Sequence, residues 1–509
     1  METIIKKIDL NEIDDAALSE AGEIIKAGGL VAFPTETVYG LGANALDREA
    51  AVKTYLAKGR PQDNPLIVHI ADLDALYAVA EEVPEDALKL AEKFWPGPMT
   101  LILKKSDKVP YETTGGLDTC AVRMPDNAVA LGLIRAAGGF VSAPSANTSG
   151  RPSPTEARHV SEDLSGKIDM ILDGGSTDIG VESTIIDMTG GVPCILRPGA
   201  ITEEQVRDLL GVCEMDQTLL SDKSQEAPKA PGMKYRHYAP KADLMVVEGT
   251  LSGAVKAIRQ LAFASERRGE KVGIISTSDS ADSYTHGIVK ILGSRKNEET
   301  LARNLYKVLR EFDEENVDVI FSEMFGLSGI GTALMNRLLK AAGHKVIDAE
   351  TVLGLQKYRK IVFVCDSDSC RAPMAAELLK QKTGELLQEY EIASRGMVVL
   401  FPEPVNQKAE AIMKSKQMTL GDHTAKAFEA AEMTEDTLIL SMDMKQKDTL
   451  RENVRETEFI YTLPEFVRAG EEVVSPYGGA LADYGETWET LRDLIEKLVE
   501  KLNKEAQEL

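Results

Sequence analysis

Short apolar segments alternate with amphipathic segments along the whole chain, and this alternation predicts an α/β protein. Apolar runs such as 28–33 and 100–105 have the length and composition of buried strands. From residue 244 onward the alternation is regular, which indicates a compact doubly wound unit. Its predicted elements are strands 244–249, 271–277 and 317–323 and helices 252–268, 298–312 and 332–343.

The last part of the chain opens with a predicted strand at 360–365 and closes with a long amphipathic helix. Apolar side chains of that helix recur every three or four residues and share one face. We expect this face to pack into a core. Its members are Trp488, Leu491, Leu494, Ile495, Leu498 and Leu502.

Changes in composition divide the chain into four parts. A chain of 509 residues is too long for one core, and a polar, proline-punctuated stretch with no sustained periodicity separates two patterned regions. The predicted parts are a twisted open α/β sheet in 1–211, a linker in 212–241, a small Rossmann-like α/β domain in 242–355 and a parallel α/β domain in 356–509.

The net charge of −24 and the pI near 4.9 argue against a surface that holds nucleic acid, so direct binding of tRNA is not expected. No apolar run approaches the roughly 20 residues of a membrane span, and the first residues lack the features of a signal peptide. Five cysteines without a CxxC pair predict reduced thiols and no metal site. Together these features predict a cytoplasmic protein.

The first predicted domain carries several polar loop motifs next to apolar strands. In an open α/β sheet such strand ends form the ligand site, and the cations Lys58, Arg60, Arg123 and Arg197 suit a polyphosphate. The alternative is that these loops only make turns and that the arginines pair with carboxylates. The motifs are FPTETVYGLG (33–42), KGRPQDNPLIVHI (58–70), KFWPGPMTLIL (93–103), GLDTCAVRMP (116–125), SAPSANTSGRPSPT (142–155), GVESTIID (180–187) and ILRPG (195–199).

In this order and at these spacings, the motifs resemble the YrdC-like threonylcarbamoyl-AMP synthases. The resemblance continues through APGMKYRHYAP (230–240) and GIGTALMNRLLKAAG (329–343), as in the long, two-domain form of that family. It implies a reaction of L-threonine, bicarbonate and ATP, with Mg²⁺ on the ATP and no tightly bound cofactor. The products are threonylcarbamoyl-AMP, which is handed to the t6A-forming machinery that modifies tRNA, and pyrophosphate.

The resemblance also implies roles for individual residues, each inside a matched motif. Lys58, Arg60 and Arg123 would stabilise negative charge during the reaction. The expected ATP contacts are Arg60, Asn64, Thr119, Ser145, Ser153 and Arg197. The expected threonine contacts are Thr37, His69, Arg123, Ala143 and Ser183, and the expected lid residues are Tyr235, His237 and Tyr238. The second domain is expected to influence this site through the linker.

The stretch CDSDSCR (365–371) combines Cys365 and Arg371 in a Cys-x5-Arg loop between a strand and a helix, the layout of a thiolate nucleophile with a phosphate clamp. From 360 to the end the chain resembles the low-molecular-weight protein tyrosine phosphatases. It departs from them at Asp368, Ala372 and Ser475, where that family has asparagine, serine and the general acid aspartate. The aspartates of the loop are also expected to raise the pKa of the thiol.

Three interpretations of this last domain follow: a non-hydrolytic phosphatase-like module, a weak or altered phosphatase, and a redox sensor that forms a Cys365–Cys370 disulfide. The leading hypothesis for the whole chain is a threonylcarbamoyl-AMP synthase with an appended, degenerate phosphatase-like domain. The alternative is an active phosphatase with Cys365 as nucleophile, regulated by the N-terminal domains.

Overall fold

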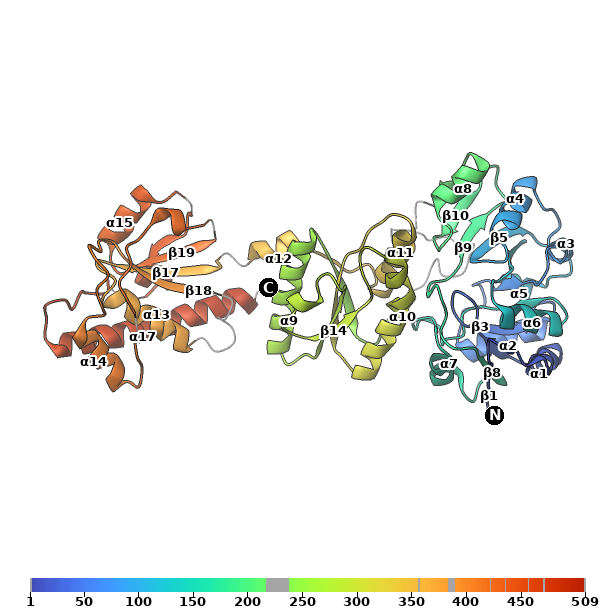
Figure 1. Ribbon diagram of the computed structural model, residues 1–509, viewed down its shortest axis with the longest axis horizontal. Coiled ribbons are helices and arrows are strands. Elements are labelled where there is room, and N and C mark those ends of the chain that lie inside the picture. The colour runs from blue at the N-terminus through green and yellow to red at the C-terminus, as the bar shows by residue number, and fades with distance from the viewer. Residues whose placement is uncertain are drawn as a thin grey trace. The chain divides into compact units, whose positions relative to one another are not determined.

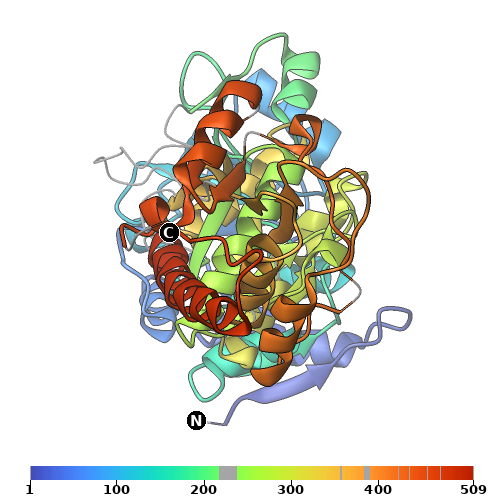
Figure 2. The same ribbon diagram turned by 90° about the vertical axis from the view of Figure 1, so that its left-hand side faces the viewer.

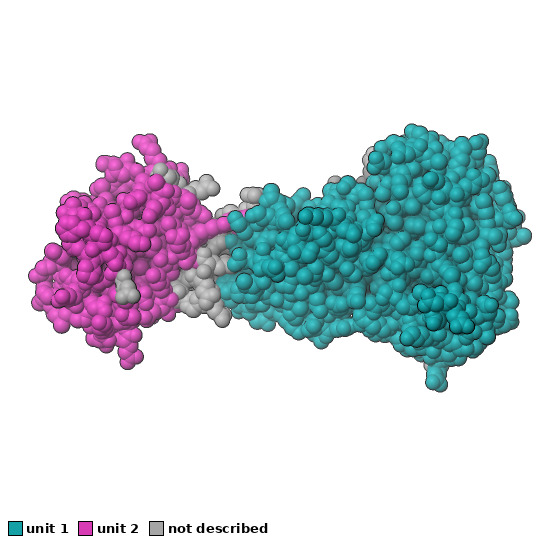
Figure 3. All heavy atoms as spheres, in the orientation of Figure 1, with its two compact units in different colours: residues 1–349 teal, residues 350–509 magenta. Residues whose placement is uncertain are grey.

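The structure is a computed structural model that describes residues 2–216, 238–355, 358–382, 390–421, 423–434, 436–455, 457–469 and 472–507. The chain divides into two compact units, Met1–Ala349 and Glu350–Leu509 (Figure 3). The first unit therefore contains the first predicted domain, the described part of the linker and residues 242–349 of the second predicted domain, whose predicted end at 355 lies in the second unit.

A mixed sheet of eleven described strands forms the N-terminal part of the first unit, in the order β1-β8-β2-β3-β7-β4-β6-β5-β9-β10-β11. The last strand lies beyond the predicted end of the domain. The strands are β1 (Ile4–Lys7), β2 (Val31–Phe33), β3 (Gly40–Asn44), β4 (Ile67–His69), β5 (Met99–Lys104), β6 (Thr119–Arg123), β7 (Val141–Ser142), β8 (Met170–Asp173), β9 (Thr184–Asp187), β10 (Cys194–Arg197) and β11 (Glu214–Met215).

Helices cover this sheet and bury apolar side chains against it. Local signals set their ends: Asp14 and Asp47 accept backbone N–H bonds at the starts of the first two helices, and Thr202 forms a capping box at the start of the last one. The helices are α1 (Asp15–Lys26), α2 (Arg48–Lys58), α3 (Leu76–Val79), α4 (Glu85–Phe94), α5 (Tyr111–Thr114), α6 (Ala128–Ala136), α7 (Ala157–Leu164) and α8 (Glu203–Leu210).

The rest of the first unit, which we call the companion domain, is a parallel sheet of five described strands in the order β14-β13-β15-β12-β16. Figure 1 shows α9 on one face of this sheet and α10 and α11 on the other, so the companion domain is doubly wound as predicted. Its elements are β12 (Asp243–Glu248), α9 (Leu251–Arg267), β13 (Val272–Ser276), the 3₁₀ turn η1 (Ala281–Ser283), β14 (Ile288–Ile291), α10 (Glu298–Glu315), β15 (Val319–Glu323), α11 (Ile330–Ala341) and β16 (Val346–Asp348).

Helix α10 has two buried faces. Leu301, Leu305 and Leu309 recur every four residues and pack into the core of the companion domain. Tyr306 and Arg310, also four residues apart, are buried and hydrogen-bond to the N-terminal part of the unit. The companion domain therefore contacts the N-terminal sheet domain directly, in addition to the linker connection expected from the sequence.

The second unit contains a parallel sheet of four described strands in the order β18-β17-β19-β20. Figure 2 shows its long terminal helix α17 in red. The elements are α12 (Ala349–Leu355), which begins at the end of the first unit, β17 (Lys360–Cys365), α13 (Arg371–Lys382), β18 (Glu391–Gly396), α14 (Gln407–Ser415), the 3₁₀ turn η3 (Ala430–Glu432), β19 (Thr437–Ser441), α15 (Met444–Asn453), β20 (Ile460–Thr462), α16 (Leu463–Phe466) and α17 (Leu481–Gln507).

The α/β fold class predicted from the apolar pattern is confirmed, and the predicted strands and helices of the companion domain lie within a few residues of the observed ones. All six apolar side chains of the stripe on α17 are buried in one hydrophobic cluster of the second unit, so the packing prediction is also confirmed. In the described residues no helix has both the length and the apolar character needed to span a membrane.

Candidate functional site

The motif that begins at Lys58 forms a turn at the end of α2. Gly59 has φ of 61°, a left-handed conformation that favours glycine and ends the helix there. The buried ammonium group of Lys58 donates to the backbone carbonyls of Ser145 and Asn147, so it ties α2 to the loop after β7. Burial, followed by the nearby Arg60, lowers the pKa of Lys58 well below its ordinary value.

The Arg60 guanidinium is oriented by Asn64, one of the predicted ATP contacts. Its Nη2 donates to Asn64 Oδ1 at 2.6 Å and its Nε donates to the Asn64 carbonyl at 3.1 Å. Burial lowers the pKa of Arg60 to about 10, which still leaves the group charged at neutral pH.

His69 and Arg123 end two adjacent parallel strands, β4 and β6, and their Cα atoms are register partners. Arg123 forms a buried ion pair with Glu36, with 2.7 Å between Nη2 and Oε1. Burial and the charge of Arg123 lower the pKa of His69 to about 3. The ring is therefore neutral at physiological pH, and the positive charge at this end of the strands belongs to Arg123.

Arg197, at the end of β10, is held by Ser183: its Nε donates to the Ser183 carbonyl at 3.0 Å and its Nη2 to Ser183 Oγ at 3.1 Å. The neighbouring residue Glu182 accepts a hydrogen bond of 2.6 Å from Ser153 Oγ. Two predicted contacts, Ser153 and Ser183, thus bond directly to charged side chains of the site.

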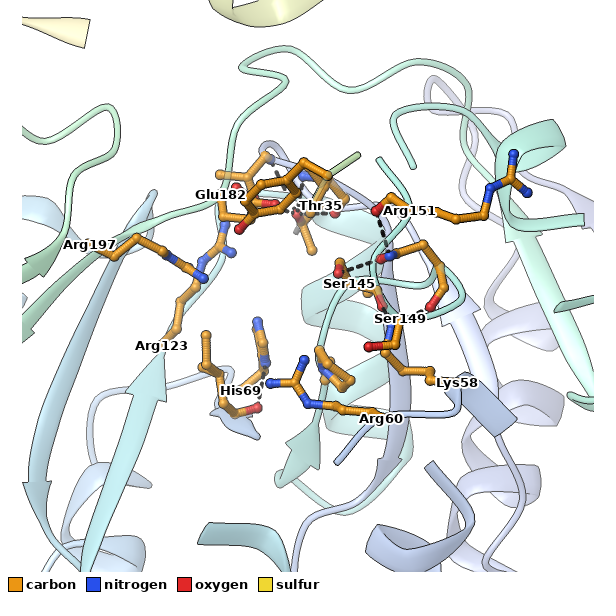
Figure 4. A pocket seen from close by; sticks show the side chains of 18 of the residues that line it. Thr35, Lys58, Arg60, His69, Arg123, Ser145, Ser149, Arg151, Glu182 and Arg197 are labelled. Atoms are coloured by element: carbon orange, nitrogen blue, oxygen red, sulfur yellow. Dashed lines mark hydrogen bonds between the residues drawn. The ribbon is translucent and has the colours of Figure 1, made fainter. Parts of the chain in front are cut away.

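These strand ends and loops enclose one pocket. In Figure 4, Arg123 and Arg197 lie on one side of an open space and Lys58 and Arg60 on another, while Arg151 points away. The predicted residues that line the pocket are Thr37, Lys58, Arg60, His69, Arg123, Ala143, Ser145, Arg197 and Tyr238.

Four predicted contacts do not line it. Asn64, Ser153 and Ser183 each bond to a lining side chain, as described above, and Thr119 begins β6, where it pairs with Lys104 of β5. The predicted lid residues Tyr235 and His237 lie outside the described residues.

Sequence reasoning did not select Glu36 or Glu182, the two carboxylates next to the cations of this site. Both lie inside loop motifs of the first domain, FPTETVYGLG and GVESTIID. In FPTETVYGLG the available signal was that Glu36 is the single charged residue of the motif; GVESTIID also contains Asp187, so Glu182 carried no such signal. Their partners, Arg123 and Arg337, are distant in the sequence.

The Cys-x5-Arg loop of the second unit connects β17 to α13. The guanidinium of Arg371 in this loop hydrogen-bonds to other groups of the protein. Its Nη2 donates to Asp366 Oδ2 at 2.5 Å and its Nη1 to the Val473 carbonyl at 2.6 Å. Ser475, where the resemblance expects the general acid, is exposed and its Oγ accepts from the Tyr477 N–H at 3.5 Å.

Cys365 is buried, and burial raises the pKa of its thiol, with Asp368 acting in the same direction. Asp368 is fully buried, has φ of 53°, accepts from the Lys426 N–H at 2.9 Å and lies 3.3 Å from His423 Nε2. The direction of the pKa shift and the contribution of Asp368 agree with the sequence-based expectation, whereas the largest cause is burial of the thiol, which the sequence analysis did not name. All five cysteines of the chain lie in the described part and are free thiols.

Fold and site together define an α/β enzyme with a cation-lined pocket at the strand ends of its N-terminal sheet. Residues 23–199 match the family described as "Telomere recombination", residues 201–343 match "Threonylcarbamoyl-AMP synthase, C-terminal domain", and residues 360–508 match "Low molecular weight phosphotyrosine protein phosphatase".

The chain is 50% identical over 335 residues to the threonylcarbamoyl-AMP synthase of Pyrococcus abyssi. The aligned region covers 66% of this chain and 96% of that protein. It is 49% identical to the enzyme of the same name from Bacillus subtilis, over 66% of this chain and 95% of that protein. The crystal structure of P. abyssi Sua5 complexed with L-threonine is 49% identical, has a TM-score of 0.65 and covers 68% of this chain and 99% of that one. The chain therefore belongs to the threonylcarbamoyl-AMP synthase family, with an added low-molecular-weight phosphatase-like domain.

Proposed function

We propose that the first unit converts L-threonine, bicarbonate and ATP into threonylcarbamoyl-AMP and pyrophosphate, in the cytoplasm, and supplies the t6A modification of tRNA by handing over its product. The observation that carries this proposal is the pocket, in which Lys58, Arg60, Arg123 and Arg197 converge around one space. The P. abyssi relative crystallised with L-threonine supports the amino-acid substrate.

In this proposal the amine of threonine attacks the carbon of bicarbonate, an N–C bond forms and water is lost. A carbamate oxygen then attacks the α-phosphorus of ATP and pyrophosphate leaves. Arg123 binds the threonine carboxylate beside the neutral ring of His69, while Lys58, Arg60 and Arg197 face the phosphates. Fixed cations stabilise the charge that develops at phosphorus, and holding three reactants together replaces collision by positioning.

Mg²⁺ would enter with ATP. The carboxylates nearest the cations, Glu36 and Glu182, are engaged with Arg123 and Arg337. Among the described residues the pocket therefore does not offer a carboxylate cage, and the phosphates and water would hold most of the coordination sphere of the ion. The side chains of the chain itself position the three reactants and supply the compensating positive charge.

Release of pyrophosphate tests the proposal. Full-length protein with ATP is expected to release pyrophosphate only when L-threonine and bicarbonate are both present, with threonylcarbamoyl-AMP detected by mass spectrometry. L-Valine, which has the shape of threonine without the hydroxyl group, is the matched control substrate. Pyrophosphate release that does not depend on threonine would contradict the assignment.

For the second unit we propose a non-hydrolytic, phosphatase-like role. The observation that favours it is the 2.5 Å contact between Asp366 and Arg371, in which a carboxylate of the loop occupies the guanidinium that would clamp a phosphate. The buried thiol with a raised pKa and the replacement of the expected general acid by Ser475 support the same conclusion, because general acid catalysis contributes about 10²–10⁴-fold.

We therefore predict that the native chain does not hydrolyse p-nitrophenyl phosphate. A variant carrying Asp366→Ala, Asp368→Asn, Ala372→Ser and Ser475→Asp is expected to gain at least about 10²-fold in hydrolysis, because clamp, loop support and general acid are restored together. Cys365→Ser added to that variant is the control and should abolish the gain. Cys365-dependent turnover by the native chain would favour the phosphatase alternative instead.

A further inference from the structure

A carboxylate of the synthase pocket is held by two side chains of the companion domain. Glu182 lines the pocket, and its Oε2 accepts from Arg337 Nε of α11 at 2.8 Å. The hydroxyl of Tyr306 on α10 lies 3.0 Å from Oε1 and 2.9 Å from Oε2 of the same carboxylate. Arg337 and Tyr306 are both fully buried, so water does not compete for these bonds.

The same two side chains also contact Tyr238, a second residue of the pocket wall. The rings of Tyr238 and Tyr306 are 5.1 Å apart, and the guanidinium carbon of Arg337 lies 5.9 Å from the centre of the Tyr238 ring. Arg337 and Tyr306 of the companion domain therefore contact two pocket-lining residues, Glu182 and Tyr238, that are far apart in the sequence.

The backbone beside Glu182 is shaped for this contact. Gly180 has φ of 81°, and a Cβ atom there would lie 2.4 Å from the main chain of Arg303 on α10. A glycine is required at such a close approach. Arg303 Nε in turn donates to the Asp178 carbonyl at 2.5 Å, so α10 packs directly on the loop that carries Glu182.

The charge of Glu182 matters because the pocket, in the proposed function, receives a triphosphate. Burial opposes ionisation of this carboxyl, yet Arg337 and then Arg197 lower its pKa to about 2, so it is an anion at neutral pH. An unneutralised carboxylate would repel the phosphates and would attract Arg197, a pocket cation that faces them. Arg337, which is buried and does not line the pocket, provides the positive charge that compensates Glu182.

We propose that Arg337 and Tyr306 are positioning residues of the synthase site: they neutralise and orient Glu182, which keeps Arg197 directed at the nucleotide. The companion domain thereby completes the ATP side of the pocket through direct side-chain contacts. This inference rests on the proposed function, because it assumes that the pocket binds ATP.

Calorimetric titration with ATP tests it on the full chain. Arg337→Met is expected to weaken ATP binding at least about tenfold, since it leaves a buried carboxylate unpaired next to the phosphates. Arg337→Lys, which keeps the charge, should retain most of the affinity. Lys307→Met is the control, because Lys307 on α10 of the companion domain also forms an ion pair with a carboxylate of the N-terminal sheet domain, Glu156 (3.2 Å), but does not line the pocket. This variant should bind ATP like the native chain.

Rescue separates positioning from a general structural role. If Arg337 acts through the charge of Glu182, the double variant Arg337→Met/Glu182→Gln should bind ATP as well as Glu182→Gln alone. This comparison also holds if Arg337→Met by itself does not fold, because the double variant contains no unpaired carboxylate.

A further loss of about tenfold in the double variant, or native affinity in a folded Arg337→Met protein, overturns the inference. A native chain that neither binds ATP nor releases pyrophosphate overturns the proposed function itself, and the inference with it. The two failures are therefore distinguishable.

Discussion

Replacement of Lys58 by methionine is expected to lower threonine- and bicarbonate-dependent pyrophosphate release by about 10²–10³-fold, the usual effect of removing one preorganised charge or donor from a reacting centre. Lys58 is buried in the wall of the pocket and its ammonium group bridges the carbonyls of Ser145 and Asn147. Burial lowers its pKa, and a bound triphosphate would favour the charged form again. The lysine thus holds the loop after β7, and in the proposed mechanism it would also supply charge to the phosphates.

Lys53→Met is the control for this variant. Lys53 lies on the same helix α2 and its ammonium group also donates to a backbone carbonyl, that of Gly28 at 2.8 Å, but it does not line the pocket. It should therefore keep native activity. Both variants are compared by steady-state rates of pyrophosphate release, measured below their unfolding temperatures. If the rate of Lys58→Met is within threefold of the rate of Lys53→Met, Lys58 has no part in the proposed mechanism.

Replacement of Arg123 by methionine is expected to have two separable effects. The kcat/KM for threonine should fall by about 10²–10³-fold, because the carboxylate of the substrate loses its charge-assisted partner. The protein should also lose about 3–5 kcal/mol of stability, because Glu36 remains buried without its ion-pair partner. ATP binding measured without threonine should change little.

The double variant Arg123→Met/Glu36→Gln distinguishes these effects. Neutralising residue 36 should restore most of the stability in urea unfolding, whereas the activity with threonine should stay low. Arg135→Met, a substitution on α6 outside the pocket, serves as the control for loss of an arginine. If activity returns together with stability in the double variant, Arg123 has a structural role and does not bind the threonine carboxylate.

Much of this protein could be predicted from its sequence because the relevant signals are local. The order of apolar strands and amphipathic helices predicted the α/β class and the doubly wound companion domain, since burial of one helix face or one strand imposes a short repeat. The stripe from Trp488 to Leu502 is such a repeat, and it packs as expected. Motif chemistry at strand ends indicated the four cations Lys58, Arg60, Arg123 and Arg197, and the family resemblance implied the other five predicted residues that line the pocket.

The positions of Asn64, Ser153 and Ser183 could not be predicted in the same way. Each is predicted to contact a substrate, and the structure shows in addition that each bonds to a charged side chain: Asn64 to Arg60, Ser153 to Glu182 and Ser183 to Arg197. A motif specifies that a hydroxyl or amide lies near the site. Which neighbour it meets depends on side-chain geometry.

The sequence by itself determined the fold class, the family resemblance and the cations that the pocket needs. Only the tertiary structure decided which charges are compensated. Glu182 pairs with Arg337 and Glu36 with Arg123, residues far apart in the sequence, and no motif indicated either pair. The physical reason is that periodicity records which face of an element is buried, whereas the partner of a buried charge is set by packing between distant segments, where desolvation makes an unpaired charge costly.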